Sequence, residues 1–295
     1  MTRDGHALPF AATLAGVALY ALMDALMKGS SLAIGTYSAL LWRSVVAVLL
    51  AIPLWRLSGG RWPGRKTVRL HLLRGTVAAA MALTFFYGLT LLPMAEAIAI
   101  SFIAPLIALY LAAVTLGETI RKDTVGASLL GLAGVAVIAW SRLDASGHDD
   151  RAALGIGSVL LSALLYAWNL VLQRRQAQVA GPLEVASFMN ATVLLALLPA
   201  APWLAEMPGE PRLAMAIAGA AVLAVTAGML FSWAYARAEA QVLVPVEYSA
   251  FAWAALMGWL AFGERLTWPT LFGTVLVIAA CWIAAPRRRP EQTAT

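Results

Sequence analysis

The sequence predicts an all-α polytopic membrane protein, with ten transmembrane helices arranged as two inverted five-helix repeats. Three observations support this prediction. The 295 residues are 61% hydrophobic and only 12% charged, which is far from the composition of a water-soluble domain. Apolar runs of about 20 residues, the length that crosses a hydrocarbon core of about 30 Å, recur along the chain. Similar segments also return at a constant offset of 146 residues.

The apolar runs give the expected helices, over residues 8–28, 34–56, 70–92, 95–116, 124–141, 152–173, 183–205, 212–236, 241–262 and 268–285. Because the runs are continuously apolar and do not alternate, the backbone hydrogen bonds must close within helices and not between barrel strands. The first run is long and lacks a following small-residue cleavage site, so we expect it to remain as the first helix.

The distribution of Lys and Arg predicts the orientation of these helices. If the N-terminus is cytoplasmic, the inner segments carry 15 of these residues and the outer loops carry 5. Cytoplasmic loops of membrane proteins hold the excess of basic residues, so both termini are expected inside. The net charge of +6 then reflects membrane topology, because the basic residues are scattered in loops beside spans. We therefore expect no nucleic-acid partner.

An internal repeat divides the chain into two halves, residues 1–147 and 148–295. The segment YALMDALMK at 20–28 aligns with YAWNLVLQR at 166–174, and Gly117-Glu118 aligns with Gly263-Glu264. Each half holds five expected helices, so the second half enters the membrane upside down. Halves related in this way can open a central site to each side in turn, as is common in carriers. Duplication kept for stability alone is the other interpretation.

Two charged residues are expected deep in the membrane. At 1.5 Å per residue, Arg43 lies about 3 Å from the midplane and Glu247 about 9 Å inside the inner end of its helix. Charges at such depths require a protein interior or a wet cavity and a partner. For Arg43 the alternatives are a structural contact and contact with a substrate carboxylate. For Glu247 they are a favourable charge at a helix start and a pathway or proton-binding role.

The candidate pathway residues combine these charges with polar and aromatic side chains. At the repeat offset, Glu247 aligns with Ser101, and Arg43 aligns with Met189 or, with one residue of slip, Asn190. Aromatic residues near span ends can belong to interfacial belts or to the pathway. The candidates are Arg43, Tyr87, Ser101, Tyr166, Asn169, Asn190, Trp233, Glu247 and Tyr248. We also expect Asp24 to pair with Lys28 at i+4, and Glu118 and Glu264 to be structural residues at helix ends.

Other residue types argue against an enzyme. The histidines, His6, His71 and His148, are expected in the tail and in loops, and the sequence has no Cys/His cluster and no Gly-rich phosphate loop. The single cysteine, Cys281, is expected to be a packing residue. We therefore expect no catalytic residues, no metal and no cofactor.

The sequence resembles the EamA branch of the drug/metabolite transporter superfamily over essentially its whole length. The resemblance lies in the paired Gly-Glu elements at 117–118 and 263–264, in the Gly-rich helices that follow them and in the arginine of LLWRSVVAVLL. It implies a ten-helix carrier of small organic metabolites in a bacterial-type cytoplasmic membrane. The implied pathway is lined by the third, fourth, eighth and ninth helices with the first and sixth.

Within this family the sequence is most similar to YddG-type exporters of aromatic and other neutral amino acids. The expected partners are then a small-molecule substrate and the lipid bilayer. The block PVEYSAFAWAALMGWLAFGE also resembles importers of S-adenosylmethionine-like metabolites, and an efflux carrier for cationic drugs is a further alternative. Substrate, direction, proton coupling and oligomeric state stay open.

Overall fold

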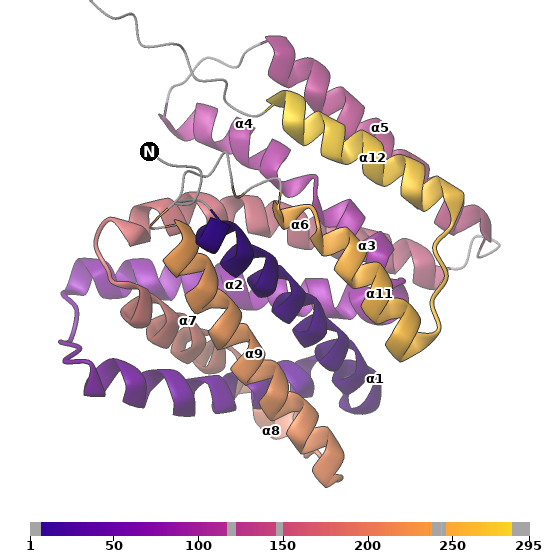
Figure 1. Ribbon diagram of the computed structural model, residues 1–295. Coiled ribbons are helices and arrows are strands. Elements are labelled where there is room, and N and C mark those ends of the chain that lie inside the picture. Colours follow the sequence, from indigo (N-terminus) through magenta and orange to yellow (C-terminus); the bar gives the residue numbers. More distant parts are fainter. Residues whose placement is uncertain are drawn as a thin grey trace, which may run out of the picture.

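The computed structural model describes residues 7–116, 122–145, 150–235, 237, 243 and 246–284, and these residues are almost entirely helical. The helices are α1 (Ala7–Leu57), α2 (Arg65–Leu91), α3 (Met94–Ser101), α4 (Ala104–Leu116), α5 (Lys122–Ala145), α6 (Asp150–Ala177), α7 (Pro182–Leu197), η2 (Leu198–Ala200), α8 (Ala201–Leu204), α9 (Pro211–Tyr235), α11 (Ala250–Phe262) and α12 (Trp268–Ala284). Figure 1 shows them as one bundle, with α5 and α12 side by side.

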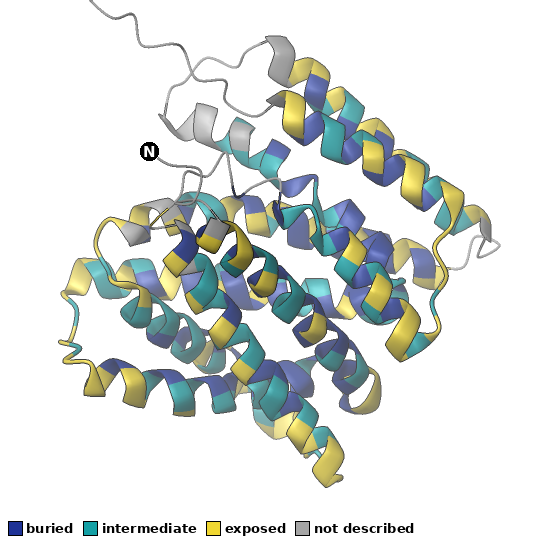
Figure 2. Cartoon of the chain, in the orientation of Figure 1, coloured by how far each residue is buried: buried dark blue, intermediate teal, exposed yellow. Residues whose placement is uncertain are grey.

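Within the described residues, six helices are long and apolar enough to cross a membrane, and shorter apolar helices cover Met94–Ala108, Ala250–Phe262 and Trp268–Ile283. Large apolar side chains cover the outer faces of α5 and α12, where Figure 2 shows many exposed residues. They include Leu129, Leu132, Trp140, Trp268, Phe272 and Trp282. An apolar surface of this kind fits lipid better than water.

The longest helix, α1, is two arms joined at a kink. A straight helix of its 51 residues would be about 76 Å long, more than twice the hydrocarbon thickness. Ile34 and Gly35 leave the helical conformation, and Gly35 takes φ 77°, which only glycine adopts readily. The break between the first two expected helices therefore lies at residues 34–35, slightly after the expected gap at 29–33.

The helix bounds recur at the offset found in the sequence. Helix α2 begins at Arg65 and α9 at Pro211, and α5 begins at Lys122 and α12 at Trp268, so both pairs are 146 residues apart. The packing follows the same pairing: the contact of α2 with α6 corresponds to that of α9 with α1, and α5 packs on its own equivalent, α12. Exchanging the halves therefore exchanges or preserves these contacts.

Small residues allow close packing between α5 and α12. A Cβ added at Gly134 would lie 2.6 Å from the carbonyl oxygen of Gly273, and the reverse substitution meets the same obstacle. Gly131 faces Leu106 and Ala280. The backbones of α5 and α12 therefore cross in direct contact, as small residues permit in membrane helices.

Candidate functional site

A break interrupts each of two equivalent helices near the centre of the bundle. Helix α3 ends at Ser101 and α4 begins at Ala104; 146 residues later, a helical turn ends at Glu247 and α11 begins at Ala250. Both breaks are 3₁₀-type turns, with hydrogen bonds from Ile103 N–H to Ile100 O (3.2 Å) and from Ser249 N–H to Val246 O (3.0 Å). Non-helical backbone at membrane depth is tolerated where it lines a cavity or lies within protein.

The residues that follow the two breaks touch each other. The rings of Phe102 and Tyr248, which align at the repeat offset, meet edge to face with centroids 5.3 Å apart. The thiol of Cys281 lies 3.3 Å from the carbonyl oxygen of Phe102 and contacts Tyr248, so it is a packing residue as expected. Two equivalent positions can touch only near the axis that relates the halves. The breaks therefore lie at the middle of the molecule.

A second equivalent pair, Tyr20 and Tyr166, brings the buried charges together. The charges of Arg43, Asp24, Arg74 and Glu247 all act on the Tyr20 hydroxyl, and those of Glu247 and Arg74 act on Tyr166. The predicted residues Tyr166 and Glu247 therefore lie in the same region as Arg43, because all three are within electrostatic range of Tyr20. Asp24, which was expected to pair with Lys28, is 9% exposed and lies within electrostatic range of Tyr20 and Arg43.

Arg43 lies half-buried on the second arm of α1. Its Nη1 is 4.0 Å from the Met23 sulfur, and its guanidinium carbon is 5.7 Å from the centre of the Phe86 ring. Asp24 supplies the opposite charge within electrostatic range. The Arg43 Nε forms no hydrogen bond within the described part of the chain. The guanidinium thus retains a donor that a ligand or water can use.

A polar group that we call the Arg74 cluster joins α2, α6 and α7. Arg74 Nε donates to Asn169 Oδ1 and Nη2 donates to Gln173 Oε1, each at 3.0 Å, and Nη1 donates to Gln176. Gln176 also contacts His71 Nδ1, and His71 Nε2 lies 3.1 Å from Glu184 Oε1. His71 is fully buried and stacks on Phe188 with ring centroids 4.7 Å apart.

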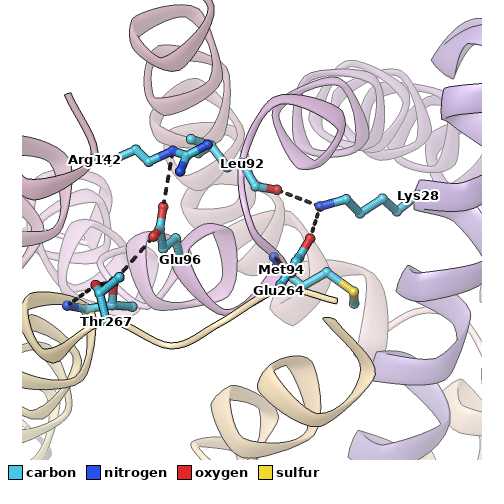
Figure 3. A network of polar contacts seen from close by, with 8 residues as sticks. Lys28, Leu92, Met94, Glu96, Arg142, Glu264 and Thr267 are labelled. Atoms are coloured by element: carbon cyan, nitrogen blue, oxygen red, sulfur yellow. Dashed lines mark hydrogen bonds and ion pairs between the residues drawn. The ribbon is translucent and has the colours of Figure 1, made fainter. Parts of the chain in front are cut away.

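A second group, the Lys28 cluster, lies at the C-terminal end of α2. Figure 3 shows its residues and contacts. Lys28 Nζ donates to Leu92 O at 2.7 Å and forms an ion pair with Glu264 Oε1 at 2.5 Å, while Glu264 Oε2 accepts from the Met94 N–H at 2.7 Å. Beside it, Arg142 Nε lies 3.7 Å from Glu96 Oε2. From Arg74 to Leu92 the α2 axis rises about 27 Å, close to the hydrocarbon thickness.

The other predicted residues stand apart from these clusters. Ser101 Oγ donates to Ala97 O at 2.8 Å, and Asn190 Nδ2 donates to Ala186 O at 2.9 Å, one turn back in each helix. Tyr87 is 45% exposed on α2. Trp233 is 38% exposed and carries the Arg237 guanidinium 4.5 Å from its ring centre. The structure therefore groups Tyr166, Asn169, Glu247 and Arg43 and leaves these four outside.

Two expectations from the sequence are wrong. Lys28 does not pair with Asp24, because Glu264 offers it a carboxylate that also accepts the Met94 N–H. Glu264 itself is a helix-end residue, as expected. His71 lies in α2 and not in a loop, because Gln176 and Glu184 satisfy both of its nitrogens. Among the expected residues, His6, Gly117, Glu118 and His148 lie outside the described residues.

Sequence reasoning missed the Arg74 cluster, since Arg74 was counted among the inner basic residues. A signal was present on α6, where residues 166, 169, 173 and 176 follow helical spacing and are all polar. An apolar span with such a stripe needs a polar partner on another helix. No group of acidic, histidine or cysteine side chains suited to a metal occurs in the part of the chain that the structure covers.

The fold and the site define a multi-pass membrane protein with buried charges gathered at broken helices. A model of the EamA-like transporter family matches residues 8–140 and again 153–285, so the chain belongs to this family. The family consists of membrane transporters, so the chain is not an enzyme.

Two of the curated relatives are similar over most of their length, and a third over a shorter part. The pseudopaline exporter CntI of Pseudomonas aeruginosa is 24% identical, covering 89% of this chain and 90% of the relative. A riboflavin transporter of Brucella anthropi is 25% identical, covering 81% and 84%. The aromatic amino acid exporter YddG of Ancylobacter novellus is 33% identical, covering 39% of each chain. A crystal structure aligns with a TM-score of 0.64 at 22% identity, covering 93% of this chain and 96% of that one, which shows the fold.

Proposed function

We propose that this protein is a secondary carrier that exports aromatic and other neutral amino acids by alternating access. The observation that carries the proposal is the match of a transporter family to both halves, together with helix breaks that recur 146 residues apart. Discontinuous helices at a repeat interface are the usual place of substrate sites in secondary transporters. The similarity to the YddG exporter supports the substrate.

The proposed topology has ten spans. They are the two arms of α1, then α2, α3 with α4, α5, α6, α7 with α8, α9, the segment ending in α11, and α12. Five spans in each half, residues 1–147 and 148–295, make the halves inverted. The excess of Lys and Arg supports a cytoplasmic location of both termini. Membership of the transporter family, with bacterial relatives, supports a bacterial cytoplasmic membrane. On this topology the Arg74 cluster is near the inner face and the Lys28 cluster near the outer face.

The two clusters support alternating access because each joins both halves. The Lys28 cluster ties α1 and α3 to the end of α11, and the Arg74 cluster ties α2 to α6 and α7. A carrier must loosen one end while the other stays closed. The proposed pathway runs between them, past Arg43, Ser101, Tyr166, Asn169, Glu247 and Tyr248; the exposed residues Tyr87 and Trp233 and the half-buried Asn190 are proposed to flank it.

Proteoliposomes test this proposal. Vesicles containing the purified protein and loaded with unlabelled tryptophan should take up labelled tryptophan by exchange, with and without an imposed proton gradient. A panel of phenylalanine, leucine, S-adenosylmethionine and a lipophilic cation sets the substrate class. Failure of every compound in the panel contradicts the carrier proposal.

A second candidate, transport of cations, is favoured by the acidic residues Asp24 and Glu247 within electrostatic range of Tyr20. A cationic solute would need one of these carboxylates as its counterion. Glu247→Gln should then abolish uptake of the cation and leave exchange of neutral amino acids intact. If both are lost together, the acidic side chain serves neutral substrates as well.

A further inference from the structure

Arg74 is a buried cation whose hydrogen-bond acceptors are all neutral. Its side chain belongs to a residue that is 6% exposed, and its three hydrogen bonds go to the amides of Asn169, Gln173 and Gln176. An arginine cannot lose its charge, so burial carries a large desolvation cost unless an anion compensates for it. Among the described residues, the Arg74 guanidinium forms no ion pair with a carboxylate.

Glu184, the acid of the cluster, is connected to Arg74 only through His71 and Gln176. The Gln176 amide donates to His71 Nδ1, so His71 donates from Nε2 to Glu184 as a neutral imidazole. This arrangement turns the Gln176 oxygen toward Arg74. A guanidinium has five N–H donors, and three are used here. Two donors of Arg74 therefore remain for an acceptor that the cluster does not supply.

The other half of the molecule shows that the fold does not need a polar cluster at this place. At the offset of 146 residues, Gln176 and Glu184 align with the uncharged residues Ser30 and Ser38. The other four members align with apolar positions: His71 with Ile217, Arg74 with Ala220, Asn169 with Met23 and Gln173 with Met27. All four partners are buried in the core. Apolar side chains thus satisfy the equivalent packing between α9 and α1. A charged cluster between α2 and α6 has a role other than packing.

The position of the cluster suggests that role. Tyr166 and Gln173, both exposed, flank buried Asn169 on one face of α6. Tyr166 lies within electrostatic range of Arg74, of Tyr20 and of Glu247. The Arg74 cluster therefore borders the central tyrosine pair and has exposed side chains at its edge.

We propose that the Arg74 cluster is the binding site for a carboxylate group of the transported solute. The two unused N–H donors form the charge-assisted hydrogen bonds that arginine makes with carboxylates. The inference rests on the proposed carrier function and narrows it: the solutes bear a carboxylate, and amides or esters of the same molecules are excluded.

Ligand-dependent thermal stability of the purified protein in detergent tests the site without transport. Indole-3-propionate should raise the melting temperature, and indole-3-propionamide, which lacks the carboxylate, should not. In Arg74→Gln the concentration for half-maximal stabilisation should rise at least about tenfold, and Arg74→Lys should recover part of the loss. Arg142→Gln, which removes an arginine of the Lys28 cluster, should show the same ligand-dependent rise in melting temperature as the unmodified protein.

Asn169→Asp is a second test variant that is expected to stay folded, so a lost ligand response in it cannot be attributed to unfolding. Asn169 Oδ1 already lies 3.0 Å from Arg74 Nε, so the new carboxylate supplies an internal counterion. The variant should be at least as stable as the unmodified protein, yet its response to indole-3-propionate should disappear. A cluster that only joins helices predicts an unchanged ligand response.

The outcomes separate this proposal from the carrier proposal. A carboxylate-specific stabilisation that is lost in Arg74→Gln and Asn169→Asp supports the site, even if vesicles show no flux, in which case only the transport function fails. Stabilisation that is equal for acid and amide, absent for both, or retained in Asn169→Asp overturns the site, even if the protein transports amino acids.

Discussion

The Lys28 cluster and the Arg74 cluster are separated by about 27 Å along α2. They differ in whether the buried cation is paired with a carboxylate. In the Lys28 cluster each cation faces a carboxylate, Lys28 with Glu264 and Arg142 with Glu96, and the remaining bonds satisfy helix ends. In the Arg74 cluster the cation faces neutral amides. The charges of the Lys28 cluster balance without a ligand, whereas the Arg74 guanidinium has no carboxylate partner among the described residues. The difference separates a structural tie from a candidate binding site.

The largest expected effect comes from breaking the balanced cluster. Glu264→Ala leaves buried Lys28 without its counterion and the Met94 N–H without its acceptor. Removal of one partner of a buried ion pair costs about 3–5 kcal/mol of unfolding free energy. Unfolding by SDS in mixed micelles measures this loss. Glu206→Ala, at an exposed site, is the matched control, and equal stability of the two variants would refute the structural role of Glu264.

A smaller effect is expected at the crossing of α5, which carries Arg142, and α12, whose Thr270 Oγ1 donates to Glu96 Oε1 at 3.4 Å. In Gly273→Ala the new Cβ would meet the Gly134 carbonyl at 2.6 Å, so the two helices must separate. Overpacking of this kind costs about 1–3 kcal/mol. Gly126→Ala on α5, where a Cβ meets open space, should instead be neutral or stabilise by up to about 1 kcal/mol. The same unfolding titration compares them, and equal losses would show that the crossing is not close.

Replacement of the unbalanced cluster by apolar residues should change stability little. In Arg74→Met/Asn169→Met both new side chains are apolar, like the equivalent residues of the other half, Ala220 and Met23. Apolar substitutes for buried charges are often neutral or stabilising, so we expect a loss below about 2 kcal/mol. Tryptophan exchange in proteoliposomes should nevertheless stop. A variant that is strongly destabilised would show that the cluster is needed for folding.

The smallest effect is expected at the second ion pair of the Lys28 cluster. Arg142 lies 3.7 Å from Glu96 and its side chain is 33% exposed, so solvent weakens the attraction. Arg142→Gln should lower the unfolding free energy by about 0.2–1 kcal/mol. If this loss equals that of Glu264→Ala, the two pairs form one cooperative unit and the ranking made here is wrong.

Much of the fold could be predicted from the sequence because hydrophobic runs and the repeat are local signals. The kink at Ile34–Gly35 falls near the expected gap, and Glu264 is at a helix end as expected. The break after Ser101 was missed because the run over 95–116 is continuously apolar; Pro105, whose ring disfavours a preceding helical turn, was the available signal.

The candidate site was only partly predictable. Tyr166, Asn169 and Glu247 were named from their polarity within apolar runs, and the structure places them with Tyr20 and Arg74. The partners of Lys28 and Arg74 come from distant helices, 236 and about 100 residues away, so spacing within one helix could not identify them. The i+4 pair of Asp24 and Lys28 failed for the same reason. In both cases, contacts between helices that are distant in the sequence determine the partner of the buried cation.

Exchange of labelled tryptophan in proteoliposomes tests the central claim most directly when it is measured for the unmodified protein, Arg74→Gln and Arg142→Gln side by side. The account predicts rapid exchange of tryptophan but not of tryptophanamide by the unmodified protein and by Arg142→Gln, and none by Arg74→Gln. Equal exchange of tryptophan by Arg74→Gln, or exchange of the amide at the same rate, would contradict the account.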